Sequence, residues 1–234
     1  MKNTIQNKTK LVNSVFSKVY KKYDLMNDIM SFGIHRLWKN QLINWMNPSS
    51  GSKLIDVASG TGDIAKLFSK RQNNTSEITC VEPNTEMFEE GRNNLKDFNN
   101  IKWIRSQAEK IPVKDNTFDF YTISYGIRNV TDINKTLSEA FRVLKPGGRF
   151  MCLEFSKIDN EVLNFFYKQY SKTIPLIGKL VVGSSGPYDY LVNSIDKFYD
   201  QNQLIKLITN NGFSNAKYRN LSNGVSAIHS GWKI

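Results

Sequence analysis

The chain of 234 residues is predicted to form one α/β domain around a mostly parallel sheet. Short apolar runs alternate with segments of helical spacing between residues 53 and 155, which is typical of parallel sheets. No Pro- or Ser-rich linker divides the chain, and its length suits a single domain with a sizeable core. We expect residues 1–48 to form an N-terminal helical extension and residues 49–234 to form the main domain.

Two helices are predicted before the first strand. Apolar and aromatic residues recur at roughly helical spacing over residues 12–23, which indicates an amphipathic helix. A second helix is predicted over residues 38–46, where Asn47-Pro48 ends the pattern.

The central part of the chain alternates between strands and helices. Strands are predicted over residues 53–57, 77–82, 101–105, 118–125 and 149–155. Helices are predicted from Asp63, over residues 85–97 and over residues 132–144. Pro146-Gly147-Gly148 turns the chain into the fifth strand.

The C-terminal part is predicted to add helices and a final pair of strands. A helix is expected over residues 161–173, followed by an irregular apolar segment over residues 174–183, because Pro and Gly interrupt it. Another helix is expected near residues 202–210. Strand-like runs around residues 216–219 and 225–232 most simply form an antiparallel pair.

Composition argues against several classes of function. The formal net charge of +11 is spread along the chain, whereas a nucleic-acid-binding module needs a clustered basic face, so we expect no nucleic-acid partner. Cys80 and Cys152 lie in apolar runs, which suits buried thiols in a reducing compartment. His35 and His229 are far apart and lack metal-ligand spacing, so we expect no metal.

The chain has no apolar run near the roughly 20 residues of a membrane span. Its first residues lack the apolar core of a signal peptide. We therefore expect a cytoplasmic protein, or one peripheral to the inner face of a membrane.

A glycine turn follows the first predicted strand. Ligands in parallel sheets bind at the carboxyl ends of the strands, where Gly60-Thr61-Gly62-Asp63 lies. The turn also fits the dinucleotide pattern, and Glu82 lies at about the distance expected for a ribose-binding acid. An NAD-binding oxidoreductase is therefore one interpretation.

Charge favours a different ligand for this turn. Asp56 and Asp63 would both repel a pyrophosphate at the helix N-terminus. S-adenosylmethionine has no phosphate and carries a sulfonium and an ammonium group, which carboxylates attract. Gly60 and Gly62 would let the backbone approach its amino-acid part, while Glu82 would accept hydrogen bonds from both ribose hydroxyls. An ordinary strand-turn-helix with N-cap carboxylates is the alternative.

From about Val15 onward the chain resembles the ubiquinone/menaquinone biosynthesis C-methyltransferase family of class I S-adenosylmethionine-dependent methyltransferases. The resemblance rests on residues 23–28, 31–36, 56–63, 122–130, 142–149, 153–156, 188–191 and 229–233. It implies a three-layer Rossmann-like α/β fold with a mostly parallel seven-stranded sheet, a C-terminal antiparallel strand and an N-terminal helical lid. It also implies C-methylation of a polyprenylated hydroquinone ring, as a benzoquinol methylase, a demethylmenaquinol methyltransferase or both. Residues 231–234 look more like family members that serve ubiquinone.

The chain departs from the family pattern at three places. Ser59 replaces a glycine, Glu82 replaces an aspartate, and Gln107 stands where an acid or amide precedes an Ala-Glu pair. Glu82 and Gln107 keep the hydrogen-bonding capability of that pattern. Ser59 requires backbone angles that do not need glycine.

The resemblance implies a set of donor contacts, namely Thr61, Glu82, Gln107, Ala108 and Ser124. Asp56, Gly60, Gly62 and Asp63 complete the floor of that site on the charge argument above. An exposed loop amide is the alternative for Gln107, and a small residue packed at a strand end is the alternative for Ser124.

The resemblance also places Arg128 and Asn129 beside the donor, in the loop after the fourth strand. Carbon is a poor nucleophile, so the substrate should be the reduced quinol, and a base should help to remove its phenolic proton. Arginine stays protonated and cannot easily be that base. We hypothesise that Arg128 holds a quinol oxygen or a water that relays the proton, with Asn129 supporting it; a salt bridge to a carboxylate is the alternative for Arg128.

Candidate quinol contacts lie in the predicted lid, at Tyr20, Tyr23, Asp24 and His35. Structural packing is the alternative for each of them. Residues 173–183 are expected to admit the isoprenoid tail or to touch a membrane, and the alternative is a loop packed on the core. A peripheral membrane contact, a quinone-biosynthesis complex and a homodimer are the partners considered, and another small molecule or lipid is the alternative methyl acceptor.

Overall fold

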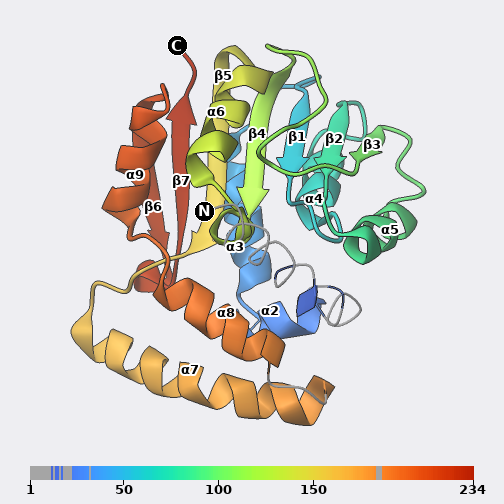
Figure 1. The fold of residues 1–234 in the computed structure, drawn as a ribbon. Coiled ribbons are helices and arrows are strands. Elements are labelled where there is room, and N and C mark those ends of the chain that lie inside the picture. Colours follow the sequence, from blue (N-terminus) through green and yellow to red (C-terminus); the bar gives the residue numbers. More distant parts are fainter. Residues whose placement is uncertain (1–11, 13, 16, 18–22, 32, 183–185) are drawn as a thin grey trace.

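The computed structural model describes residues 12, 14, 15, 17, 23–31, 33–182 and 186–234. Seven strands form one sheet in the order β3-β2-β1-β4-β5-β7-β6 (Figure 1). Their bounds are β1 Leu54–Val57, β2 Ile78–Val81, β3 Ile101–Ile104, β4 Phe118–Ser124, β5 Leu144–Phe155, β6 Ser214–Leu221 and β7 Ser226–Trp232. These strands overlap the predicted runs, although β5 begins five residues before its predicted start, at Leu144, and includes the predicted turn at residues 146–148.

Strand direction confirms the predicted mixed sheet. β1 pairs in parallel with β2 and β4, and the parallel pairing extends to β3 on one side and β5 on the other. β7 runs antiparallel to both of its neighbours, β5 and β6. The predicted antiparallel pair near the C-terminus is thereby confirmed, with β7 inserted between β5 and β6.

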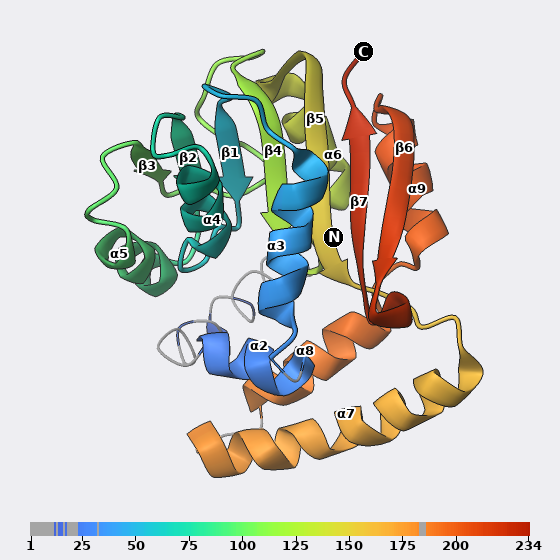
Figure 2. The ribbon, with the colours of Figure 1, turned by 180° about the vertical axis from the view of Figure 1, so that it is seen from behind.

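Helices cover both faces of the sheet and make a three-layer fold (Figures 1 and 2). On one face lie α3 (His35–Met46) and α4 (Asp63–Arg71), whose apolar residues join a buried cluster containing Leu42, Phe68 and Leu54. On the other lie α6 (Ile133–Val143) and α9 (Gln201–Asn210), which bury Leu137 and Ile208. α5 (Thr85–Asn94) lies at the β3 side of the sheet.

Side-chain caps explain where several of these helices begin. The Asn84 side chain accepts from the Met87 N–H at the start of α5, and the Asp132 side chain accepts from the Lys135 N–H at the start of α6. α9 begins with a full capping box between Asp200 and Gln203, next to the predicted start of the helix.

The N-terminal helices agree with the sequence where the structure describes them. α3 begins three residues before the predicted start, at His35. A short helix that was not predicted, α2 (Tyr23–Ser31), precedes it. Most of the helix predicted over residues 12–23 lies outside the described residues, although Val12, Ser14, Val15 and Ser17 have helical backbone.

The prediction of an irregular segment after residue 173 is wrong. α7 runs without a break from Glu161 to Val182 and contains Pro175. A proline inside a helix costs about 3 kcal/mol, and packing of the neighbouring turn offsets that cost, because Ile174 is fully buried and Tyr170 packs on the same core cluster. α8 (Gly186–Asp196), also not predicted, contacts α7.

Helices α2, α8 and α7 lie beyond the carboxyl ends of the parallel strands, with α7 outermost (Figure 1). Cys80 and Cys152 are buried free thiols, as predicted. None of the helices in the described ranges is long and apolar enough to cross a membrane. Within those ranges, no cluster of three or more His, Cys, Asp or Glu side chains is arranged to hold a metal ion.

Candidate active site

The turns after β1 and β4 are held against each other at the carboxyl edge of the sheet. Ala58 and Tyr125, directly after these strands, adopt left-handed backbone angles with φ of 52° and 54°. Such angles cost a non-glycine residue roughly 1–2 kcal/mol, so surrounding packing must maintain them. Gly126 allows the close approach, because a Cβ on it would lie 2.6 Å from the Ala58 Cβ.

Two adjoining cavities open at this edge and share Ala58, Gly60 and Tyr125 in their walls. The first is lined by predicted donor residues Asp56, Gly60, Thr61, Asp63 and Ser124. The second is lined by Gly60, Glu82, Gln107 and Ala108. Gly62 serves the packing behind them, since a Cβ on it would lie 2.5 Å from Leu95 Cδ1.

Glu82 fixes the glycine turn through both carboxylate oxygens. Oε2 accepts from the Gly60 N–H at 2.9 Å, and Oε1 accepts from the Asn84 N–H at 2.9 Å. Burial raises the pKa of Glu82 to about 7, against the lowering effect of these two hydrogen bonds. Each oxygen retains acceptor capacity, so the geometry is compatible with the predicted contact to ribose hydroxyls.

Asp56 and Ser124 present polar atoms to the first cavity. The Thr122 hydroxyl donates to Asp56 Oδ1 at 2.7 Å. Asp56 Oδ2 and Ser124 Oγ have no hydrogen-bond partner among the residues that the structure describes. Burial raises the pKa of Asp56 to about 7. Because a buried polar atom without a partner costs about 1–3 kcal/mol, these two atoms fit a cationic ligand that donates hydrogen bonds.

Lys39 is a wall residue that the sequence analysis did not single out. Its Nζ lies 2.5 Å from Asp63 Oδ2, which links α3 to the start of α4. Burial would raise the pKa of Asp63, but the Lys39 ammonium holds it below its ordinary value. Asp63 is therefore ionised and already paired within the cavity wall.

The Ser59 side chain adds hydrogen bonds to the turn, and the backbone at this position does not need the conformational freedom of glycine. Its φ is not positive, unlike that of Gly60, so the turn does not require a glycine at position 59. The Ser59 hydroxyl donates to the Asp56 carbonyl at 2.6 Å and accepts from the Val81 N–H at 3.0 Å. The serine thus ties the end of β1 to the end of β2.

Arg128 lies in the short 3₁₀ helix η2 (Ile127–Asn129), and its side chain is buried against β5. Its Nη1 donates to Glu154 Oε1 at 2.5 Å and to the Tyr125 carbonyl at 2.8 Å. The guanidinium also faces the Phe155 ring at 5.6 Å. Burial raises the pKa of Glu154, and the guanidinium opposes that effect. The carboxylate pairing considered for Arg128 is therefore present.

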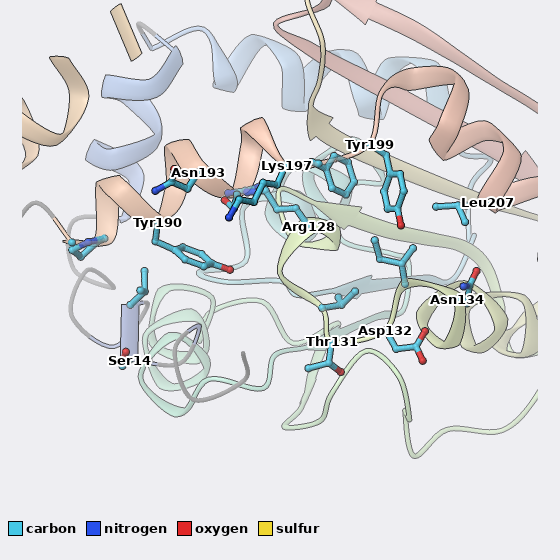
Figure 3. A pocket seen from close by; sticks show the side chains of 17 residues that line it. Ser14, Arg128, Thr131, Asp132, Asn134, Tyr190, Asn193, Lys197, Tyr199 and Leu207 are labelled. Atoms are coloured by element: carbon cyan, nitrogen blue, oxygen red, sulfur yellow. The ribbon is translucent and has the colours of Figure 1, made fainter. Parts of the chain in front are cut away.

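Asn129 lies between the cavity lined by Glu82 and Gln107, here called the donor cavity, and a third, larger cavity. Its Oδ1 accepts from the Tyr190 hydroxyl of α8 at 2.9 Å, and its Nδ2 donates to the Tyr125 carbonyl at 3.4 Å. Tyr190 and Arg128 line a cavity of about 950 Å³, together with Lys197 and Asn193 (Figure 3). Asn129 itself lines the donor cavity, so this amide lies at the boundary between the two.

The structure gives less support to the residues predicted as quinol contacts in the lid. Tyr20 lies outside the described residues, and Tyr23 and Asp24 lie in α2 with no side-chain placement to describe. His35 is buried, its Nε2 lies 2.9 Å from Asp28 Oδ1, and burial lowers its pKa. These contacts tie His35 to α2, so its role toward a quinol stays a prediction.

The ubiE/COQ5 methyltransferase family matches residues 3–233 of the chain. The chain belongs to this family. The expected methyltransferase is thereby confirmed, as is its dependence on S-adenosylmethionine. C-methylation in quinone biosynthesis is the activity of this family, so the expected class of reaction is confirmed as well.

Two similar proteins align with nearly the whole of this chain. A ubiquinone/menaquinone biosynthesis C-methyltransferase from Rickettsia bellii is 51% identical over 97% of this chain and 94% of its own length. A mitochondrial 2-methoxy-6-polyprenyl-1,4-benzoquinol methylase from Dictyostelium discoideum is 44% identical over 98% of this chain and 83% of its own.

Two solved methyltransferase structures share the fold of this chain. A SAM-dependent methyltransferase from Thermotoga maritima superposes with a TM-score of 0.68 at 20% identity, covering 95% of this chain and 100% of its own. A phosphoethanolamine N-methyltransferase from Haemonchus contortus, in complex with S-adenosylhomocysteine, has a TM-score of 0.63 at 13% identity, covering 84% of this chain and 52% of its own.

Proposed function

We propose that this family member transfers a methyl group to a ring carbon of a polyprenylated hydroquinone in ubiquinone or menaquinone biosynthesis. The observation that carries the proposal is the meeting of two cavities at one loop. Val130 and Thr131 lie in the wall of the donor cavity and also in the wall of the 950 Å³ cavity. A ring in the larger cavity would therefore lie next to a donor in the smaller one, as group transfer requires.

The donor would be held by the residues predicted for it. Glu82 would bind the ribose, Gln107 and Ala108 the adenine side, and Asp56 with Ser124 the amino-acid and sulfonium side. When bound, S-adenosylmethionine supplies the methyl group as an electrophile on a positively charged sulfur. Thr61, Gly60 and the paired Asp63 complete the wall around it.

Arg128 stabilises negative charge on an oxygen of the quinol. The ring carbon becomes nucleophilic when an adjacent hydroxyl loses its proton, and the guanidinium at the cavity wall stabilises the negative charge that develops on that oxygen. The proton passes to a water, because arginine stays protonated. Glu154 holds Arg128 in position through its hydrogen bond to Nη1.

Asn129 and Tyr190 orient the acceptor. Their mutual hydrogen bond of 2.9 Å crosses the boundary between the two cavities, so a shift of α8 moves both groups together. Tyr190 also lines the larger cavity, where we expect it to contact the quinol (Figure 3). We assign a benzoquinol as the preferred acceptor, on the resemblance of residues 231–234 to ubiquinone-serving members.

The N-terminal segment completes the site as a lid. We propose that residues 1–48, including Tyr20, Tyr23, Asp24 and His35, close over the domain formed by residues 49–234. Support comes from Val12, which lines the donor cavity, and from Lys39, which pairs with Asp63. A closed lid excludes water from the transfer step.

We place the enzyme in the cytoplasm, in peripheral contact with the inner face of the membrane, because a polyprenyl quinol resides in lipid. Direct contact is favoured here over recruitment through a quinone-biosynthesis complex or a homodimer, because α7 exposes apolar side chains to solvent.

Quinone-lipid analysis of cells that lack this protein tests the proposed function. We expect accumulation of a benzoquinone that lacks one ring methyl group, and restoration by the wild-type chain but not by a Glu82→Ala chain. Accumulation of demethylmenaquinone instead would change the assigned ring. An unchanged quinone profile, with labelled methyl groups appearing in another molecule, would overturn the proposal.

A further inference from the structure

Helix α7 has apolar side chains both toward the body of the protein and toward solvent. On the inner face, Ile174 is fully buried, and the Tyr170 hydroxyl donates to the Ile29 carbonyl of α2. The other face carries exposed apolar residues, here called the outer stripe: Val162 (66% exposed), Phe165 (59%), Phe166 (64%) and Leu176 (66%). Separations of three, four and fourteen residues from Val162 place them on one side of a helix with about 3.6 residues per turn.

Other residues in the described part of the chain leave the outer stripe largely uncovered. The Phe165 and Phe166 rings lie 5.7 Å apart, edge to face, and both stay open to solvent. Val162, Phe165 and Phe166 form the main exposed apolar group, and the exposed polar residues Gln169 and Thr173 separate it from Leu176. Clustered exposed apolar side chains of this kind mark an interaction site on a folded protein. Since inner-face residues already anchor α7 to the body, the outer stripe is not needed to hold the helix in place.

Basic residues flank the outer stripe. Lys172 and Lys179 are exposed, and they lie four residues before and three residues after Leu176, on the adjacent side of the helix. The one acidic residue in α7 is Glu161, at its first position. An apolar face with Phe and Leu beside a lysine-rich flank is the pattern of helices that lie in a membrane interface. The lysines match anionic headgroups in charge.

The position of α7 connects this surface to the site. α7 is the outermost layer beyond the carboxyl ends of the strands, with α8 between it and the sheet (Figure 1). Phe165 also lines a cleft of about 670 Å³ between α7 and α8, together with Tyr167 and Val192. The opposite wall of α8 carries Tyr190 and Asn193 at the 950 Å³ cavity. Helix α8 thus separates the cleft beside α7 from the 950 Å³ cavity.

We propose that the outer stripe docks on the surface of a bilayer that contains anionic lipids. Phe165 and Phe166 enter the boundary between headgroups and acyl chains, and Lys172 and Lys179 contact the headgroups. The helix lies on the membrane without crossing it. This inference deepens the proposed function, on which it rests for the lipid nature of the acceptor, but docking itself requires no catalysis.

Vesicle co-sedimentation of the full chain tests the docking. The vesicles contain phosphatidylcholine alone or phosphatidylcholine with phosphatidylglycerol. Because each phenyl side chain contributes strongly when buried, we expect Phe165→Ser/Phe166→Ser to weaken vesicle binding by about tenfold or more on both lipids. Lys172→Gln/Lys179→Gln should lose roughly thirtyfold on anionic vesicles at low salt and little on neutral ones.

Ile234→Ser is the matched control, because Ile234 is 79% exposed and lies at the far end of the molecule from α7. It should leave vesicle binding unchanged. All variants should bind S-adenosylmethionine and methylate a short-tailed, water-soluble quinol as well as the wild type. The Phe variant should lose turnover only with a long-tailed quinol held in vesicles.

Two results would overturn the docking proposal. One is unchanged vesicle binding by Phe165→Ser/Phe166→Ser. The other is a wild-type dimer in analytical ultracentrifugation that becomes a monomer in this variant without loss of vesicle binding, which would assign the outer stripe to a second copy. Failure of the wild type to methylate the short-tailed quinol, with vesicle binding intact, would instead contradict the proposed function alone.

Discussion

The Arg128 guanidinium and the Glu154 carboxylate form an ion pair removed from water, with 2.5 Å between Nη1 and Oε1 and both side chains 1% exposed. Glu154 belongs to β5 and Arg128 to the loop after β4, so the pair ties the loop of residues 127–129 to the sheet. Removal of two charges from water is costly, and their attraction offsets that cost only while both are present.

Replacement of Glu154 by Leu should leave the guanidinium buried without a counter-charge. We expect the free energy of unfolding to fall by about 3–5 kcal/mol, and turnover to fall with it. Urea unfolding followed by circular dichroism measures the first effect, and methyl transfer to a short-tailed quinol measures the second.

The double variant Arg128→Met/Glu154→Leu separates structure from chemistry. It removes both charges, so it should recover most of the lost stability while methyl transfer stays undetectable and donor binding stays within a few-fold of wild type. Methyl transfer by this stable double variant at the wild-type rate would remove Arg128 from the mechanism.

The stability of the donor-free protein should fall as pH rises from about 4.5 to about 7. Glu82 has its pKa raised from 4.5 to about 7 by burial, so across this range the unfolded chain releases a proton that the folded chain retains. Glu82 alone should contribute about 3 kcal/mol below this window, lost as pH rises through it. Urea unfolding at a series of pH values should show a shallower slope for Glu82→Gln; an identical slope would contradict the assignment.

Donor affinity should change with pH in the opposite direction. A cationic ligand favours ionised carboxylates, and Asp56, like Glu82, has its pKa raised to about 7 by burial. Binding of S-adenosylmethionine near neutral pH should therefore release protons and strengthen as pH rises. Calorimetry in two buffers of different ionisation enthalpy measures that release. Equal apparent enthalpies in both buffers would show that neither carboxyl ionises on binding.

Gly91→Ala should disturb the glycine turn, because Gly91 lies on the side of α5 that packs against it. A Cβ on Gly91 would lie 2.2 Å from the Trp103 ring and 2.9 Å from the Gly60 carbonyl. We expect a loss of about 1–3 kcal/mol in stability and weaker donor binding. Gly147→Ala is the control: its φ is +78° but nothing lies within 4 Å of a new Cβ, so it should cost roughly 1–2 kcal/mol and leave donor affinity unchanged. Equal donor affinity in both variants would argue against contact through Gly60.

Ser59→Gly should destabilise the chain even though the family resemblance implies a glycine at this position. The change removes the hydrogen bonds of the hydroxyl to Asp56 and Val81 and leaves the buried Val81 N–H without that acceptor. We expect a loss of about 1–3 kcal/mol in the free energy of unfolding, with donor affinity nearly unchanged. Thermal or urea unfolding that matches the wild type would show that the turn relaxes to satisfy Val81 in another way.

The strands and the glycine turn were predictable because their signals are local. Apolar runs mark β1 and β4, and the charge of Asp56 and Glu82 beside the turn selects a cationic ligand. Lys39 and Glu154 were not identified, because their partners Asp63 and Arg128 lie 24 and 26 residues away and meet them only in the folded chain. The predicted helix ended at Thr173, short of the observed Val182, since the burial of Ile174 that offsets Pro175 belongs to tertiary packing.

The insertion of β7 between β5 and β6 sets the order in which a growing chain can complete the sheet. β6 is synthesised before β7, yet it reaches the sheet only through β7, which pairs with β5 from Arg149–Trp232 to Phe155–Ser226. On the ribosome, the β5 edge therefore waits with unpaired N–H and C=O groups, the kind of surface that recruits other nascent strands. The yield of active enzyme should depend on how well chaperones shield that one edge during translation.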